Sequence, residues 1–441
     1  MIRTLCALGA LIVLSACGGG GGGGSSSSAV SSTPPVTTPP PPATAANSAT
    51  ITVDAGPAVL DTGPGAYIQD NTLYVSVTLC APGTTNCQTI DHVLVDTGSV
   101  GLRIFQSVLS PGLLSALPLQ TDASGDPVGE CYGYIDGYVF GSVRQADFQI
   151  GGETVAGMPM QVVADTGVFS AVPSSCSSGG GANLNTVQLF GANGIIGLGV
   201  TTTDCGTFCQ TAGGFSAAVY YDCPTSGCAS IIARTAATTA PFQQLPNPVA
   251  AMSVDNNGVI ISLPASSAAG QASLTGTLYF GIGTQTNNAL GAATVLTTTT
   301  SSSPNGAGLF TATYGGQSLD QSFLDSGSTT YLFVDNSIAL CTGSGFKGYY
   351  CPASPLALSP TLQGLSGATA SGAFTLNNAQ TLLSTSFSVL PGLGANPNAV
   401  SGLMAYPASF DFGLPFFYGR KIYTALEGRS AGGTAGPYIA F

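Results

Sequence analysis

Charged residues are scarce in this chain. Only 6% of its 441 residues are Asp, Glu, Lys or Arg, whereas a typical globular domain carries about 25%. Eight Lys and Arg residues stand against 20 Asp and Glu, which gives a net charge of −12. Because binding to a nucleic-acid backbone requires a cationic surface, we expect no nucleic-acid partner.

The chain has almost no histidine and no tryptophan at all. His92 is the only histidine, and there is no tryptophan. A single histidine excludes a multi-histidine metal site, and we expect neither a metal nor an organic cofactor. Four strand residues span about 13 Å at roughly 3.3 Å per residue, so His92 cannot touch Asp96 and is interpreted as structural.

Segments with the pattern of an amphipathic helix are also few. The 61 glycines and 28 prolines favour turn-rich β structure, and 44% apolar residues are enough for a sizeable core. We therefore predict an all-β fold with few short helices, the latter near Asp335–Leu340 and Phe416–Gly419. The clearest expected strands are Leu73–Leu79 paired with Thr89–Val95, Tyr138–Ile150 paired with Thr154–Val163, and Thr277–Phe280.

The N-terminal apolar run is too short to span a bilayer and is typical of a signal peptide. Residues 1–17 end in Leu14-Ser15-Ala16-Cys17, which resembles a bacterial lipobox. This resemblance implies lipidation of Cys17, and an ordinary signal peptide is the alternative. Gly18 favours the outer membrane, so we expect an exported protein that is lipid-anchored there, on its periplasmic or surface face. The Gly/Ser/Pro-rich residues 18–49 are predicted to be a tether.

Ten cysteines follow Cys17, and an even number in an exported protein favours disulfides. Close spacing suggests four pairs and leaves a fifth, although spacing alone leaves the connectivity open. The pairs are Cys80–Cys87, Cys205–Cys209, Cys223–Cys228, Cys341–Cys351 and Cys131–Cys176. Zinc is the rival interpretation, but there is no Cys-x-x-Cys motif and no nearby histidine.

Two aspartates stand out among four similar tripeptides. Asp-Thr-Gly occurs at Asp61, Asp96 and Asp165, and Asp-Ser-Gly occurs at Asp325. Only Asp96 and Asp325 follow an apolar run and precede a serine three residues later, so the other two are interpreted as loop residues. A buried carboxylate needs stabilisation, which a glycine turn and two hydroxyls can supply. Two such carboxyls in contact share a proton and can act as a general base and a general acid.

These loops and their order resemble the pepsin-like aspartic proteases. Two apolar-Gly elements, residues 193–199 and 410–424, and the strand at residues 276–281 occur in the family's order. The resemblance implies a bilobal, pepsin-like double barrel with an interlobe cleft, with lobes over residues 50–284 and 285–441. It also implies aspartic endopeptidase activity on an extended polypeptide, with no cofactor.

By the same resemblance, Asp96 and Asp325 are the catalytic pair. The supporting residues would be Thr97, Gly98, Ser99, Ser326, Gly327 and Ser328. Tyr134 would be the flap tyrosine that closes over the substrate, with Tyr132 and Tyr138 as competitors. The opening also resembles bacterial lipoproteins of unassigned function that carry pepsin-like motifs.

Arg103 occupies the region where the pepsin-like family usually has a tryptophan. It could hold a catalytic carboxylate ionised or brace Tyr134 by a cation–π contact. The first possibility leaves a second function open, a catalytically inactive peptide- or glycan-binding lipoprotein. A structural surface protein without a site would keep the two aspartates far apart.

Overall fold

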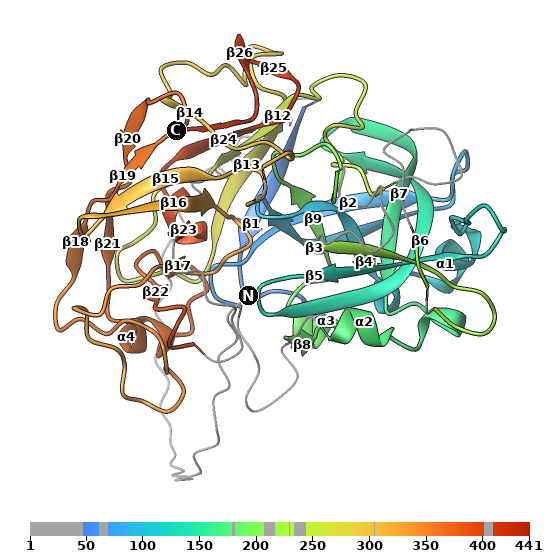
Figure 1. Cartoon of the computed structure of the whole chain (residues 1–441), viewed down its shortest axis with the longest axis horizontal. Coiled ribbons are helices and arrows are strands. Elements are labelled where there is room, and N and C mark those ends of the chain that lie inside the picture. The colour runs from blue at the N-terminus through green and yellow to red at the C-terminus, as the bar shows by residue number, and fades with distance from the viewer. Residues whose placement is uncertain are drawn as a thin grey trace, which may run out of the picture.

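The structure is a computed structural model that describes residues 47–60, 69–178, 181–206, 217–228, 230–232, 244–303, 305–400 and 409–441. Strands dominate these residues, and the helices are short. Figure 1 shows two lobes, the earlier part of the chain on the right and the later part on the left. The predicted fold class is confirmed: the molecule is all-β and bilobal, in a pepsin-like arrangement.

The strands before residue 285 are β1 (Ser48–Val53), β2 (Leu73–Cys80), β3 (Cys87–Asp96), β4 (Val100–Phe105), β5 (Val128–Gly133), β6 (Gly137–Ile150), β7 (Glu153–Val163), β8 (Ala182–Asn183), β9 (Gly194–Leu198), β10 (Ala218–Asp222), β11 (Ser230–Ile231), β12 (Gly258–Ser262) and β13 (Leu274–Phe280). The α-helices are α1 (Pro111–Ala116), α2 (Ser174–Ser177), α3 (Val187–Phe190) and α4 (Ala379–Leu383).

The later strands are β14 (Val295–Thr297), β15 (Phe310–Tyr314), β16 (Gln317–Leu324), β17 (Tyr331–Leu332), β18 (Leu356–Leu358), β19 (Thr361–Gln363), β20 (Thr369–Ser371), β21 (Phe374–Leu376), β22 (Gly394–Ala395), β23 (Asp411–Phe412), β24 (Lys421–Ala425), β25 (Ser430–Ala431), β26 (Thr434–Ala435) and β27 (Tyr438–Ala440). The predicted lobe boundary after residue 284 falls between β13 and β14.

The predicted hairpins form where expected. Strands β2 and β3 pair antiparallel, with Cys80 opposite Cys87, and β6 pairs with β7 across the Gly151-Gly152 turn. Four predicted disulfides are present: Cys80–Cys87, Cys131–Cys176, Cys223–Cys228 and Cys341–Cys351. Cys209 lies outside the described residues, as do Asp61, the signal peptide with Cys17, and the tether up to residue 46.

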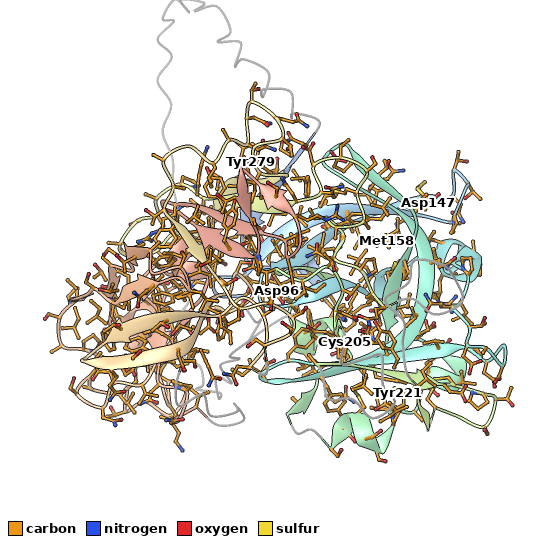
Figure 2. The ribbon with its side chains drawn as sticks, turned by 45° about the horizontal axis from the view of Figure 1, so that its top comes forward. Asp96, Asp147, Met158, Cys205, Tyr221 and Tyr279 are labelled. Carbon is orange, nitrogen blue, oxygen red and sulfur yellow. A yellow bond between two sulfur atoms is a disulfide. The ribbon has the colours of Figure 1, made fainter. Side chains whose placement is uncertain are left out.

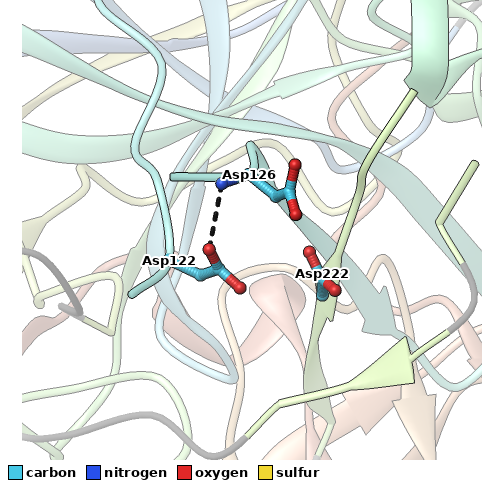
Figure 3. Close-up of side chains that lie close together, drawn as sticks. All are labelled: Asp122, Asp126 and Asp222. Carbon is cyan, nitrogen blue, oxygen red and sulfur yellow. Dashed lines mark hydrogen bonds between the residues drawn. The ribbon is translucent and has the colours of Figure 1, made fainter. Parts of the chain in front are cut away.

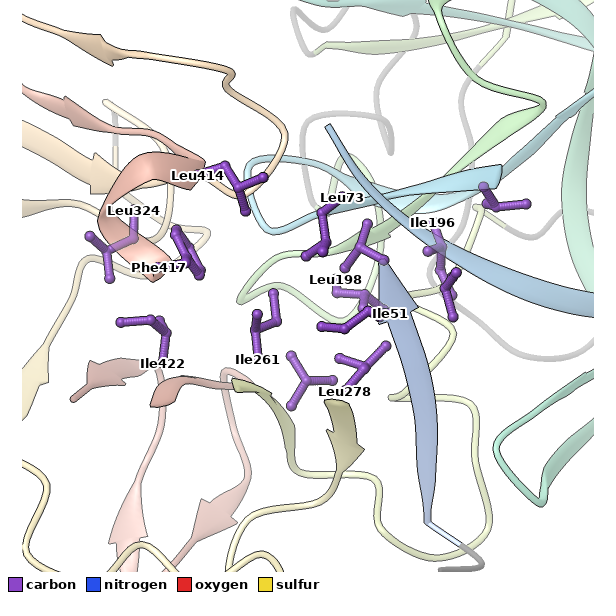
Figure 4. Packing of buried hydrophobic residues seen from close by; sticks show 14 of the residues in the cluster. Ile51, Leu73, Ile196, Leu198, Ile261, Leu278, Leu324, Leu414, Phe417 and Ile422 are labelled. Atoms are coloured by element: carbon purple, nitrogen blue, oxygen red, sulfur yellow. The ribbon is translucent and has the colours of Figure 1, made fainter. Parts of the chain in front are cut away.

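Segments far apart in the sequence join the lobes in one sheet. Strand β1 pairs with β2 and β13, and β12 pairs with both β13 and β24. Apolar side chains from both lobes pack together beside this sheet, as Figure 4 shows for Ile51, Leu198, Ile261, Leu324 and Leu414. The shared core therefore fixes how the two lobes face each other.

Three local expectations need correction. Residues Asp335–Leu340 form a turn instead of a helix, because the Asp335 carboxylate accepts hydrogen bonds from the Ser337 N–H and the Tyr314 hydroxyl. The second expected helix is a 3₁₀ turn over Leu414–Phe417, where Pro415 favours the start of a turn. Strand β1 begins at Ser48, two residues inside the segment that was predicted to be tether.

Candidate active site

The two predicted aspartates end equivalent strands. In the first lobe, β9 lies between β3, to which it is parallel, and β4, to which it is antiparallel. In the second lobe, β23 lies in the same way between β16 and β17. Asp96 is the last residue of β3, and Asp325 directly follows β16. The repeated arrangement brings two Asp-(Thr/Ser)-Gly-Ser loops together between the lobes, where Figure 2 labels Asp96.

Each aspartate is held by its own loop. Asp96 accepts hydrogen bonds from the Gly98 N–H, at 2.7 Å, and from the Ser99 hydroxyl. Asp325 accepts the equivalent pair, from the Gly327 N–H at 2.7 Å and from the Ser328 hydroxyl at 2.9 Å. These donors fix both carboxyl planes and offset part of the cost of burial.

The loops also bind each other. The Thr97 N–H donates to Ser326 Oγ at 3.1 Å, and the Ser326 N–H donates to Thr97 Oγ1 at 3.0 Å. The two hydroxyls in turn donate to main-chain carbonyls of the opposite strand, Thr97 to Leu324 and Ser326 to Val95. This symmetric set of hydrogen bonds holds the two aspartates at one fixed separation.

Glycine is required at the tip of each loop because the opposite carboxyl lies directly above it. A Cβ atom on Gly98 would lie 2.6 Å from Asp325 Cγ. A Cβ atom on Gly327 would lie 2.6 Å from Asp96 Oδ1 and 3.1 Å from Asp325 Oδ1. The two carboxyl groups therefore converge on the same small space.

The two carboxyls cannot both ionise cheaply. Burial raises the pKa of Asp96 well above its usual range, and the adjacent Asp325 raises it further; the hydrogen bonds from Ser99 and Gly98 act in the opposite direction. Asp96 is 5% exposed, whereas Asp325 is partly exposed. The environment of Asp96 therefore favours its protonated form, and the two carboxyls remain accessible from the side of Asp325.

A cavity of about 600 Å³ opens beside the first aspartate loop. Thr97, Gly98 and Tyr132 line it from the first lobe, and Leu309 and Phe323 line it from the second. Its position between the lobes matches the expected cleft, and its size suits side chains of a bound chain.

The hairpin expected to be the flap is formed by β5 and β6, and Tyr132 and Tyr134 differ in position within it. Tyr132 lines the cavity. Tyr134, which the resemblance favoured as the flap tyrosine, packs against Tyr132 and against Phe190, with ring centroids 4.9 and 5.7 Å apart. Of the two rings, the competitor Tyr132 is therefore the one that faces the cavity. Tyr138 is buried in a separate cluster around Phe140.

Arg103 contacts neither Tyr134 nor the aspartates in the ways that the sequence suggested. Its guanidinium lies over the Tyr132 ring, 3.7 Å from the centroid, so the expected cation–π brace forms with the other tyrosine. It donates to Glu130 at 2.7 Å and to Asp204 at 3.4 Å, and all three side chains are fully buried. Its charge is thus balanced away from Asp96 and Asp325.

One protein family matches most of the chain. The family described as "Protein of unknown function (DUF3443)" matches residues 43–441. The chain belongs to this family. No curated protein matches it. Among solved structures, the aspartic proteinase from Irpex lacteus is similar, with 15% identity and a TM-score of 0.44 over 89% of this chain and 96% of that chain.

Sequence reasoning missed three buried acids of this DUF3443 protein. Glu130 and Asp204 balance Arg103, and burial beside Glu130 raises the pKa of Asp204 well above its usual range. Asp411 Oδ2 lies 2.6 Å from Ser328 Oγ, and the same hydroxyl contacts Asp325 at 2.9 Å. The two apolar-Gly elements align Asp411 with Ile195. An acid at a position that is apolar in the other element was the signal that could have revealed it.

The other singled-out residues have structural roles. Asp165 is buried at the end of β7, where it pairs with Arg144 at 2.8 Å and accepts from Ser142. His92 lies 3.4 Å from Asp54 and 3.0 Å from Asp91, and the hydrogen bond to Asp54 raises its pKa although burial opposes the shift. Neither residue contacts the aspartate pair.

One group of acids outside the cleft could in principle bind a cation. Figure 3 shows Asp122, Asp126 and Asp222, which each offer one oxygen within 4.8 Å of the others. The Asp122 carboxylate already accepts hydrogen bonds from the Ser124 and Asp126 N–H groups of its own turn. This turn explains why Asp122 and Asp126 lie close together, and the pairing of Asp222 on β10 with Val128 on β5 brings the third acid beside them.

None of the helices in the described part of the DUF3443 chain has the length and apolar character required to cross a bilayer.

Proposed function

We propose that this protein is an aspartic endopeptidase. The observation that supports the proposal most strongly is the convergence of Asp96 and Asp325, each with its own hydroxyl and N–H donors. The Thr97-Gly98-Ser99 segment that follows Asp96 lines an interlobe cavity. A pair of this kind can hold one proton and one negative charge at the same time.

The reaction follows from that charge state. We assign the shared proton to Asp96, whose pKa is raised by burial and by Asp325. Ionised Asp325 takes a proton from water as the water oxygen bonds to the scissile carbonyl carbon, and Asp96 gives its proton to the carbonyl oxygen. Asp325 then protonates the amide nitrogen while Asp96 takes a proton from the gem-diol. The C–N bond breaks, an acid and an amine leave, and the pair again holds one proton.

An extended polypeptide is the substrate that suits the cavity. Its apolar lining includes Val100, Val200, Leu309, Phe323 and Ile439, which favours apolar side chains near the cut. We assign Tyr132, braced from behind by Arg103, to the flap that shields the reacting atoms from water.

The proposal includes export and attachment through a lipid on Cys17 to the bacterial outer membrane. In that setting the anchor would be the protein's membrane contact, and the disulfides would form in an oxidising compartment. Labelling of the expressed protein with a radioactive fatty acid, lost in Cys17→Ser, tests the anchor separately from the activity.

The decisive assay incubates the full chain with denatured protein between pH 3 and 7, with and without a statine-type inhibitor. We expect inhibitable cleavage that Asp96→Ala and Asp325→Ala each abolish. Asp320→Ala is the matched control, because Asp320 is an exposed aspartate on β16, five residues before Asp325. Intact substrate at every pH would refute the proposal and would favour a non-catalytic binder.

The alternative function, a catalytically inactive peptide- or glycan-binding lipoprotein, depended on Arg103 beside the aspartate pair. Because Arg103 is engaged by Glu130 and Asp204, the main reason to expect inactivity is removed.

A further inference from the structure

A third carboxyl group lies directly behind the aspartate pair. Asp411 begins β23, opposite Phe323 of β16 and Leu332 of β17, and it is 3% exposed. Its Oδ1 atom has no hydrogen-bond partner among the described residues. Its Oδ2 atom is 2.6 Å from Ser328 Oγ, and the same Oγ is 2.9 Å from Asp325 Oδ2.

Hydrogen counting shows that these contacts require an additional proton. A serine hydroxyl carries one hydrogen, so Ser328 can donate to Asp325 or to Asp411 but not to both. The second oxygen pair, at hydrogen-bond distance, must therefore take its hydrogen from a carboxyl group. Asp96 and Asp325 also share a hydrogen bond. Three carboxyls connected in this way hold two protons, whereas an isolated pair holds one.

The surroundings favour Asp411 as the holder of the extra proton. The ion pairs among the described residues do not include Asp411. The charged groups that face it are the carboxyls of Asp325 and Asp96, which oppose its ionisation.

Among the described residues of the strands beside Asp411, β16, β17 and β22, none is a cation. Asp320 of β16 is exposed, and Asp335 accepts a hydrogen bond from Tyr314 of β15. Tyr331 of β17 stacks on Phe374, with ring centroids 3.9 Å apart. Strand β22 (Gly394–Ala395) has no titratable side chain.

We propose that Asp411 is a positioning residue of this site: as a neutral acid it donates a hydrogen bond to Ser328, so that the Ser328 hydrogen is committed to Asp325. The donated bond keeps Asp325 ionised and fixed in orientation, and the proton on Asp96 completes the active charge state. The part of this inference that concerns catalysis rests on the proposed function, whereas the protonation of Asp411 does not.

Burial, followed by the charge of Asp325, raises the pKa of Asp411 well above its usual range, which agrees with this assignment. An acid whose pKa is raised by folding binds more protons in the folded state. Its contribution to stability is therefore lost as pH rises from its unfolded pKa through its folded pKa.

Infrared spectroscopy of the full chain in D₂O at pH 6 tests the protonation directly. Asp411→Asn is nearly isosteric, and we expect it to remove about one carboxyl equivalent from the protonated-acid C=O band. The exposed control Asp320→Asn leaves that band unchanged. A band that is equally strong in Asp411→Asn and the wild type would show that Asp411 is ionised and would overturn the proposal.

A second, substrate-free measurement counts the proton. Between pH 4 and 8 the free energy of unfolding of the wild type should fall more steeply with pH than that of Asp411→Asn, by a slope equal to about one proton. Equal slopes would contradict a neutral Asp411.

The catalytic part uses two variants. Asp411→Leu should lower kcat about tenfold more than Asp411→Asn, with KM unchanged, because only the Asn amide can still donate to Ser328. Equal losses would contradict the positioning role. If the wild type cleaves nothing while both measurements find a proton on Asp411, the proposed function fails and the neutral Asp411 stands. If the wild type cleaves but neither measurement finds that proton, the proposed function stands and the inference about Asp411 fails.

Discussion

The first aspartate loop is supported by β9 and the second by β23, and these supports carry different side chains at matching positions. Ile195 of β9 corresponds to Asp411 of β23, and their partners across the sheet, Arg103 and Leu332, also correspond. The first lobe thus keeps a cation one strand away from its loop and balances it with Glu130 and Asp204. The second lobe keeps an uncompensated acid next to its loop.

On the proposed function, this difference would explain how two nearly symmetric loops hold carboxyls in different charge states. The loops themselves are equivalent in their serine, glycine and hydroxyl contacts. Asymmetry therefore has to come from the residues behind them. Variants that make one lobe resemble the other test this interpretation.

The largest effect is expected when the first lobe loses its cation. Arg103→Leu copies the residue of the second lobe and leaves Glu130 and Asp204 buried without a positive partner, which should cost about 3–5 kcal/mol of unfolding free energy. Urea denaturation at pH 7 measures the loss. Burial raises the pKa of Asp204 well above its usual range, and protonation removes the charge that lost its cation, so stability should recover as pH falls toward 4. Equal losses at both pH values would contradict the role assigned to the charge.

The disulfides give the next largest effects and differ between the lobes. Cys131–Cys176 spans a sequence separation of 45 in the first lobe, and Cys341–Cys351 spans 10 in the second. Double Cys→Ser variants should lose roughly 4 and roughly 3 kcal/mol, respectively, because longer closed loops restrict the unfolded chain more. A reducing agent should lower the Tm of the wild type by more than about 10 °C. A melt that is insensitive to reduction would refute both statements.

The loop tips should respond equally. Gly98→Ala and Gly327→Ala each place a methyl group against the opposite carboxyl, so each should cost about 1–3 kcal/mol and cleavage should fall at least about 100-fold. Gly112→Ala is the control: it lies in α1 with open space around its Cβ position and should stabilise slightly. Strongly unequal losses of stability or cleavage would show that the two loops are not equivalent, although their hydrogen bonds match.

The smallest effect concerns the strands that lead into the loops. His92 precedes Asp96 by four residues, and Gln321 precedes Asp325 by four. Because folding raises the pKa of His92, its ion pairs stabilise the protein below its unfolded pKa, and this stabilisation is lost as pH rises through the folded value. His92→Gln should cost less than about 1 kcal/mol at pH 5 and almost nothing at pH 8. Thermal melts at the two pH values measure the difference.

Local signals in the sequence predicted much of this molecule. The Asp-(Thr/Ser)-Gly-Ser loops, the hairpin between Cys80 and Cys87 and the close disulfides depend on residues near one another in the chain, where turn and spacing rules apply. The partners of Arg103 depend on tertiary packing, since Asp204 lies 101 residues away. The role of Asp411 was missed because Phe410-Asp411-Phe412 reads as an ordinary strand and only the three-dimensional neighbour, Ser328, reveals the acid. Tyr132 and Tyr134 were difficult to distinguish because both lie near the tip of the same hairpin.

The hydrogen bonds between the loops join Thr97 and Ser326, which are 229 residues apart. Contacts of such separation form late in folding, because closing a long loop costs entropy before any contact is gained. On the proposed function, hydrolytic ability would arise only once both lobes have docked. A newly made molecule would thus pass through its vulnerable, unstructured stages before its own site could cut it.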